Sequence, residues 1–117
     1  MALVSALAVG VGGALGAIAR YGVGLTIERR AVDTAIVNVS GSFLFGLVVG
    51  VGLTDPVSLA ISVGFCGAFT TFSSFAVETV GLAEDGKTKT AALNAAGTLV
   101  AAVGAVLAGV VIAGTVV

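Results

Sequence analysis

Long apolar segments separated by short polar ones dominate the chain. Four apolar segments occupy about residues 2–25, 32–53, 57–82 and 90–114. Each can cross a bilayer, which takes about 20 apolar residues as a helix. Uninterrupted runs of this length are not typical of spanning β-barrels, whose strands are shorter and alternate. The pattern predicts an all-α membrane protein with four transmembrane helices, forming one unit over residues 1–117.

The first segment also has to be considered as a signal peptide. It ends in Ala17-Ile18-Ala19, which resembles a signal-peptidase site. No positive charge precedes the apolar run, however, and three further apolar segments follow it. We therefore expect a retained span.

Composition strengthens the membrane prediction and excludes several function classes. Hydrophobic residues make up 58% of the chain and charged residues 9%, whereas a soluble domain carries about 25% charged residues. The mean hydropathy is +1.22, so we expect a multi-pass protein of the cell membrane, surrounded by lipid. The net charge of −1 without a basic cluster argues against a nucleic-acid partner. With no His, a single Cys and no nucleophile–base pair, we expect no intrachain disulfide, no His/Cys metal cage and no enzyme.

The basic residues predict the orientation of the spans. Arg29, Arg30, Lys87 and Lys89 lie in the first and third connections, while the second connection has Asp55 and no basic residue. Because Lys and Arg are enriched in cytoplasmic loops, we expect these two connections in the cytoplasm and both termini outside.

A cluster of hydroxyl residues lies near the middle of the third segment. Thr70, Thr71, Ser73 and Ser74 occupy four of five positions, shortly after Gly67. Such side chains can bond back to their own helix. The alternative is an interrupted helix, which is tolerated at that depth only in protein or beside a polar cavity. Carbonyls freed at an interruption can coordinate a cation.

Four phenylalanines lie within the same segment at helical spacing: Phe65, Phe69, Phe72 and Phe75. A stripe of this kind in a membrane helix usually packs against a neighbour. The alternative uses the positive edge of the ring, which can face an anion without trapping it as a formal charge would. Periodicity leaves both readings open.

Other polar residues lie within the predicted spans. Asn38 and Ser42 share one face of the second, and Asn94 and Thr98 share one face of the fourth. They are expected either to hydrogen-bond between helices or to line a hydrated path. Arg20 and Glu78 stand near span ends, where they either snorkel to the interface or serve function. Eighteen glycines, mainly within the spans, indicate tight helix packing. Because four short helices make a small bundle with little interior, we expect a transport path at an interface between subunits.

Three motifs occur in order along the chain, namely residues 12–21 (GGALGAIARY), 38–43 (NVSGSF) and 64–75 (GFCGAFTTFSSF) with Glu78 after the last. Together they resemble the Fluc/CrcB family of fluoride channels, over essentially the whole chain. The resemblance implies passive export of F⁻ that limits its cytoplasmic toxicity. It also implies an antiparallel dual-topology-type dimer with two pores at its interface and a third helix broken near its centre.

The resemblance also assigns roles to individual residues. A structural, non-transported Na⁺ would be held by the backbone carbonyls of Gly67 and Thr70 together with those of a second subunit. Arg20 would lie near a vestibule, and Glu78 is a charged residue near the pore. The fluoride pore would be lined by Phe72, Phe75, Asn38, Thr71, Ser73 and Ser74.

Two departures from the family pattern bear on assembly and on the pore. The fourth span lacks the expected aromatic and hydroxyl residues, for which Asn94 and Thr98 are candidate substitutes. The bias of four basic residues to none raises the prospect of a heterodimer with an oppositely oriented paralogue instead of a homodimer.

The sequence leaves two other functions as alternatives. A four-helix small-molecule/proton antiporter would need an acid in the first span, which has none. A non-conducting structural subunit would explain the glycines but not the hydroxyl cluster.

Overall fold

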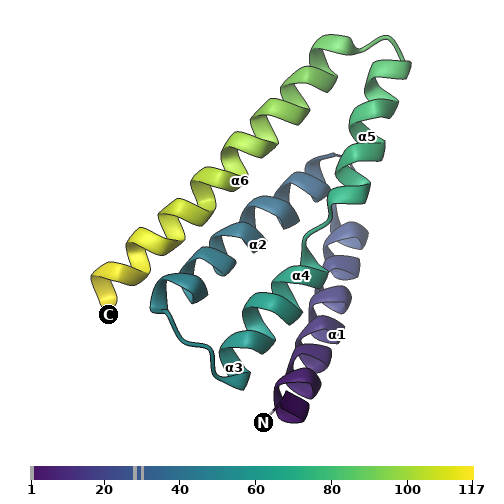
Figure 1. Cartoon of the computed structure of the whole chain (residues 1–117). Helices are drawn as coiled ribbons and strands as arrows, with labels where there is room; N and C mark the ends of the chain where they lie inside the picture. The colour runs from purple at the N-terminus through teal and green to yellow at the C-terminus, as the bar shows by residue number, and fades with distance from the viewer. Residues whose placement is uncertain (1, 28, 30) are drawn as a thin grey trace.

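The computed structural model describes residues 2–27, 29 and 31–117 and shows helices running up and down in four spans (Figure 1). The third span is built from several consecutive elements. The elements are α1 (Ala2–Thr26), α2 (Val32–Val51), α3 (Pro56–Leu59), the π-helical η1 (Ala60–Phe65), α4 (Cys66–Phe69), α5 (Phe72–Glu84) and α6 (Thr88–Val116). All four spans are long and apolar enough to cross a membrane, which confirms the prediction of a four-span helical protein.

The helix ends differ from the hydropathy boundaries by one or two residues. The second span stops at Val51 instead of residue 53, because Gly52 takes a left-handed conformation (φ 77°) and donates its N–H to the Val49 carbonyl. The first ends at Thr26, and the third and fourth extend to Pro56–Glu84 and Thr88–Val116. Helical hydrogen bonding continues into polar residues that hydropathy assigns to loops. Of the charges used to predict orientation, Arg30 lies outside the described residues.

Backbone-to-backbone packing joins α2 to α6 and explains several glycines. A Cβ on Gly109 would lie 2.5 Å from the Phe43 carbonyl oxygen and 2.7 Å from the Leu47 amide nitrogen. On the opposite helix, a Cβ on Gly46 would meet the carbonyl of Val106. Small residues let helices approach this closely where lipid provides no hydrophobic drive between them. The pair forms the most extensive helix contact of the described chain.

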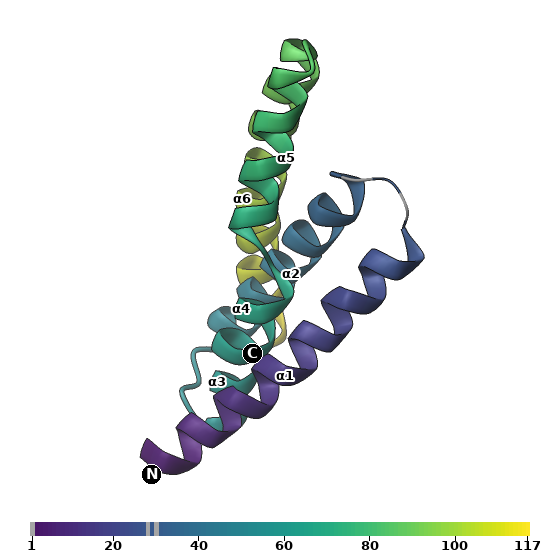
Figure 2. The same ribbon diagram turned by 90° about the vertical axis from the view of Figure 1, so that its right-hand side faces the viewer.

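The first helix packs against the beginning of the third span in the same way. Gly12 faces the carbonyl of Ala60, Gly16 faces that of Phe65, and Gly64 faces that of Val9. Toward its C-terminal end, α1 diverges from α5 and α6 (Figure 2). Both views place the α5–α6 turn beyond the N-terminal end of α2 (Figures 1 and 2).

The interior of the described chain is small. Val37 and Cys66 are among its few buried apolar residues, at 2% and 3% exposure. Large apolar side chains such as Leu7 and Leu99 are instead mostly exposed. Such an outward-facing apolar surface suits lipid or a second membrane subunit. With its four spans, the chain is a multi-pass membrane protein.

Candidate functional site

The third span contains two extended residues between helices. After α4 ends at Phe69, Thr70 (ψ 161°) and Thr71 (ψ 120°) have extended backbones, and α5 begins at Phe72. Gly67 itself is helical, so the backbone changes conformation only at Thr70, three residues later. The phenylalanine stripe is divided there into two ring pairs, Phe65–Phe69 with centroids 5.3 Å apart and Phe72–Phe75 at 6.0 Å.

Asn38 on α2 makes two hydrogen bonds to the backbone of the extended segment. Its Nδ2 donates to the Thr71 carbonyl at 3.0 Å, and its Oδ1 accepts from the Thr71 amide at 2.7 Å. The side-chain amide thus pairs with both polar groups of one residue, as a neighbouring strand would. The Thr71 amide, which donates to no helical carbonyl, is thereby satisfied within the bundle.

The two threonines use their hydroxyls differently. Thr70 Oγ1 donates back to the Cys66 carbonyl of its own helix at 2.9 Å, which is one of the two alternatives that the sequence leaves open. Thr71 is the N-cap of α5, and its Oγ1 accepts from the Ser74 amide at 3.2 Å. Thr71 Oγ1 also lies 3.4 Å from Ser73 Oγ.

These bonds bear on Gly67 and Thr70, the carbonyls predicted to hold a cation. In a continuous α-helix, each backbone carbonyl accepts a hydrogen bond from the amide four residues later in the chain. Those amides belong to Thr71 and Ser74, and they donate instead to Asn38 Oδ1 and Thr71 Oγ1. Carbonyl oxygens without helical donors are suitable ligands for a hard cation. The residues present therefore fit a Na⁺ site.

A groove of about 240 Å³ runs beside the interruption. It brings together phenylalanine rings, hydroxyls and an amide from three of the four spans. Phe72 is 79% exposed. The residues that line the groove are Asn38, Ser42, Thr70, Thr71, Phe72, Phe75, Thr98, Leu99 and Ala102.

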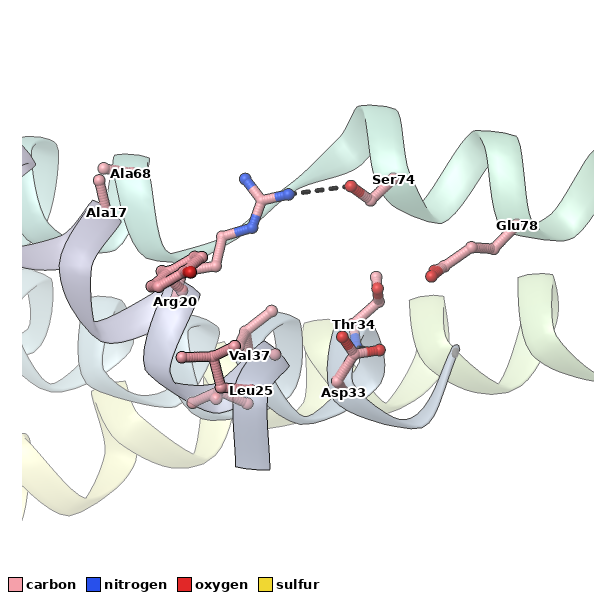
Figure 3. Close-up of a pocket in the computed structure, with 12 residues that line it drawn as sticks. Ala17, Arg20, Leu25, Asp33, Thr34, Val37, Ala68, Ser74 and Glu78 are labelled. Carbon is pink, nitrogen blue, oxygen red and sulfur yellow. Dashed lines mark hydrogen bonds between the residues drawn. The ribbon is translucent and has the colours of Figure 1, made fainter. Parts of the chain in front are cut away.

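A second cavity, of about 490 Å³, lies between α1, α2 and α5 (Figure 3). Arg20 reaches across it and donates from its guanidinium to Ser74 Oγ at 2.9 Å. Two carboxylates, Asp33 and Glu78, line the same space. Arg20 and Glu78, predicted as separate charges near the ends of two spans, thus face one cavity.

Glu78 has an uneven environment. Its Oε2 accepts a hydrogen bond from the Ala31 amide at 3.3 Å, at the beginning of α2. Ala31 has a positive φ of 69°, which a non-glycine residue rarely adopts. Among the described residues Glu78 Oε1 is buried and has no hydrogen-bond partner. A buried carboxylate oxygen of this kind is costly unless water, a proton or an ion satisfies it.

Most of the site residues predicted from the sequence line one of these two cavities, but not all of them do. Ser73 lies next to Thr71 and lines neither cavity. Asp33 and Thr34 line the Arg20 cavity and were not singled out. Their only signal was a pair of polar residues in the first turn of an apolar helix.

The remaining polar pair lies on the fourth span. Asn94 and Thr98 line one cavity together, and Thr98 also lines the groove beside Phe72. Asn94 Nδ2 donates to Thr79 Oγ1 at 2.9 Å. Thr98 is therefore the polar side chain that α6 contributes to the groove.

Fold and site together define a small multi-pass membrane protein with two cavities beside its third span, each lined partly by polar side chains. Residues 7–110 match the family model described as "CrcB-like protein, Camphor Resistance (CrcB)". The chain belongs to the CrcB family, which confirms the resemblance seen in its motifs.

Relatives with established names cover nearly the whole chain. "Fluoride-specific ion channel FluC 2" of Natronomonas pharaonis is 64% identical over 110 residues, covering 94% of this chain and 95% of the relative. A protein of the same name in Haloarcula marismortui is 50% identical over 104 residues, or 87% of each chain. "Fluoride-specific ion channel FluC" of Nitrobacter winogradskyi is 39% identical over 114 residues, covering 89% and 90%. These relatives are named as channels, in agreement with the expectation that the chain is not an enzyme.

Proposed function

We propose that the chain is a subunit of a passive channel that exports F⁻ and so limits its cytoplasmic toxicity. The observation that carries this proposal is the groove in which the rings of Phe72 and Phe75 lie beside the polar groups of Asn38, Thr71 and Thr98. Membership of the CrcB family and the printed names of close relatives support fluoride as the ion.

The chemistry of the groove suits a small, strongly hydrated anion. Hydroxyl and amide N–H groups replace lost water molecules, while the positive ring edges of Phe72 and Phe75 attract the ion weakly. No Lys or Arg is among the residues that line the groove. Conduction requires binding weak enough to permit release, and ring edges meet this need better than a formal charge.

The Arg20 cavity is the proposed vestibule. Its guanidinium supplies positive potential where the anion leaves bulk water, next to the first turn of α5. Asp33 and Glu78 offset this charge. The cavity thereby attracts anions without holding them tightly. Ser74 connects the vestibule with the neighbouring Phe75 and the groove.

Assembly as a dimer is part of the proposal, and the openness of the groove supports it. Phe72 is 79% exposed, so a single chain leaves the groove open on one side. In the proposed channel a second, antiparallel subunit closes it, and the path lies at the interface. The partner is either a second copy of this chain or an oppositely oriented paralogue. The bias of basic residues toward the first and third connections favours the paralogue.

A structural, non-transported Na⁺ is proposed at the interruption. The carbonyls of Gly67 and Thr70 would hold it, with a second subunit supplying further ligands. Its support here is that the amides of Thr71 and Ser74 donate to side chains instead of to these carbonyls. When bound, the ion would add positive potential near the groove and join the two interrupted spans.

Fluoride efflux from liposomes that contain only this purified chain tests the proposal. The liposomes hold KF, valinomycin carries K⁺, and KCl-loaded liposomes serve as the control. Fast efflux of F⁻ but not Cl⁻ supports the channel and shows that one gene product suffices. No efflux with this chain alone calls for co-reconstitution with a paralogue of opposite charge bias. Absence of flux in both preparations would contradict the proposed function.

A further inference from the structure

Two backbone amides at the interruption are held by side chains, and both stand four residues after a proposed cation ligand. The Thr71 amide donates to Asn38 Oδ1, four residues after Gly67. The Ser74 amide donates to Thr71 Oγ1, four residues after Thr70. In an uninterrupted α-helix these amides would bond the carbonyls of Gly67 and Thr70.

We infer that Asn38 and Thr71 are positioning residues for the cation, acting by keeping these helical donors away from its ligands. The inference rests on the proposed function only in placing Na⁺ at Gly67 and Thr70. It gives Asn38 a task besides lining the groove, since its Oδ1 and Nδ2 both bind the backbone of Thr71.

The same contacts select which carbonyls remain for the ion. Asn38 Nδ2 donates to the Thr71 carbonyl at 3.0 Å, and as the N-cap carbonyl of α5 this oxygen also accepts the first bond of that helix. Asn38 thus engages one carbonyl at the interruption while leaving that of Gly67 without its helical donor. Thr71 is 8% exposed and Asn38 is partly buried, so water competes little for these bonds.

Removing either side-chain acceptor, Asn38 Oδ1 or Thr71 Oγ1, lets a helical amide compete with the ion for a carbonyl ligand. Without Thr71 Oγ1, the Ser74 amide is free to bond the Thr70 carbonyl, and without Asn38 the Thr71 amide is free to bond that of Gly67. Groups that orient metal ligands from outside the coordination shell typically change metal affinity about 10–100-fold when mutated. A loss of at least about tenfold in Na⁺ affinity is therefore expected for each variant.

The experiment measures Na⁺-dependent thermal stability of the full chain in lipid, without fluoride and with choline replacing Na⁺. Thr71→Val removes the hydroxyl at nearly constant shape, and Thr71→Ser restores it. Asn38→Leu removes the acceptor of the Thr71 amide. Asn94→Leu is the matched control, because Asn94 is also a hydrogen-bonded asparagine within a span but contacts Thr79.

The Na⁺ concentration that gives half of the maximal stabilisation is expected to rise at least about tenfold in Thr71→Val and Asn38→Leu. It should stay unchanged in Thr71→Ser and Asn94→Leu. Wild-type midpoints in both Thr71→Val and Asn38→Leu would overturn the inference. If Asn38→Leu does not fold, the Thr71→Val and Thr71→Ser pair decides alone. Wild-type stability independent of Na⁺ overturns the inference together with the Na⁺ proposal. Na⁺ stabilisation without fluoride efflux would instead contradict the channel and leave the inference in place.

Discussion

Arg20 on α1 and Ser74 on α5 are joined by a hydrogen bond of 2.9 Å although 54 positions separate them along the chain. The bond crosses the cavity between α1, α2 and α5 and brings a positive charge to the first turn of α5 (Figure 3). Ser74 is also the residue whose amide is capped by Thr71. The cavity and the interruption of the third span are therefore connected through one serine.

Replacing Arg20 should slow fluoride access most strongly at low ionic strength. Arg20→Gln removes the charge, and charged clefts raise encounter rates by about 10–10³-fold. Arg20→Lys keeps the charge but not the guanidinium geometry, so it should retain more flux than Arg20→Gln. Initial efflux rates at low and high salt measure this effect. An Arg20→Gln rate that falls equally at both would show that the charge does not act on access.

Replacing Phe72 or Phe75 with Ile should abolish fluoride efflux while dimer assembly remains intact. Isoleucine fills similar volume but lacks the positive ring edge. The liposome efflux assay and size-exclusion chromatography measure the two properties. Phe43→Ile serves as a control, because Phe43 lines a separate cavity with Val39 and Ala105. Unchanged flux in both pore variants would contradict the role of the ring edges.

The hydroxyl of Thr98 should contribute to conduction from the fourth span. Thr98 lines the groove with Asn38 and Phe75. Valine has nearly the same shape as threonine but lacks its hydroxyl. Thr98→Val should lower flux about tenfold, the equivalent of one net hydrogen bond of about 1.4 kcal/mol. Thr98→Ser should stay near wild type. Equal efflux rates in the valine and serine variants would remove Thr98 from the path.

Gly12 should tolerate no side chain, whereas Gly10 on the same helix should. A Cβ on Gly12 would collide with the carbonyl of Ala60, while one on Gly10 meets nothing within 4 Å. Gly12→Ala should destabilise the fold by about 1–3 kcal/mol, as overpacking typically does. Thermal unfolding in detergent compares it with Gly10→Ala. Equal stability of the two variants would contradict close packing of α1 on η1.

The start of the third span should respond to pH through Asp55. Hydrogen bonds from the backbone and side chain of Ser58 hold the pKa of Asp55 below its ordinary value of 3.8. Because the folded pKa is depressed, the capping contribution is present above that ordinary value and is lost as pH falls through the folded pKa. The protection factor of the Ser58 amide, measured by hydrogen exchange, should therefore drop in acid.

Asp55→Asn provides the control for this pH response. Asparagine is an equally good N-cap and does not titrate, so protection of Ser58 should persist at low pH. Asp55→Ala should lower protection at every pH. A decrease in acid that is the same in Asp55→Asn as in wild type would assign the effect to another group.

The sequence by itself determined the number and nature of the spans. Length and apolarity decide whether a helix can cross a membrane, and both are local properties of the chain. The family followed equally from local motifs, since the residues of 12–21, 38–43 and 64–75 match as short segments. Asp55 and Pro56 likewise marked the start of the third span.

Only the tertiary structure decided which polar groups act together. The hydroxyl cluster left back-bonding and interruption as alternatives, and the structure shows Thr70 bonding back while Thr71 caps the next helix. Asn38 determines the partner of the Thr71 amide from 33 positions away. Periodicity describes the faces of a single helix, whereas hydrogen bonds such as these depend on which helices are neighbours and at what depth. The glycine contacts between backbones set that arrangement, because an added Cβ at Gly12 or Gly46 would collide with the facing carbonyl.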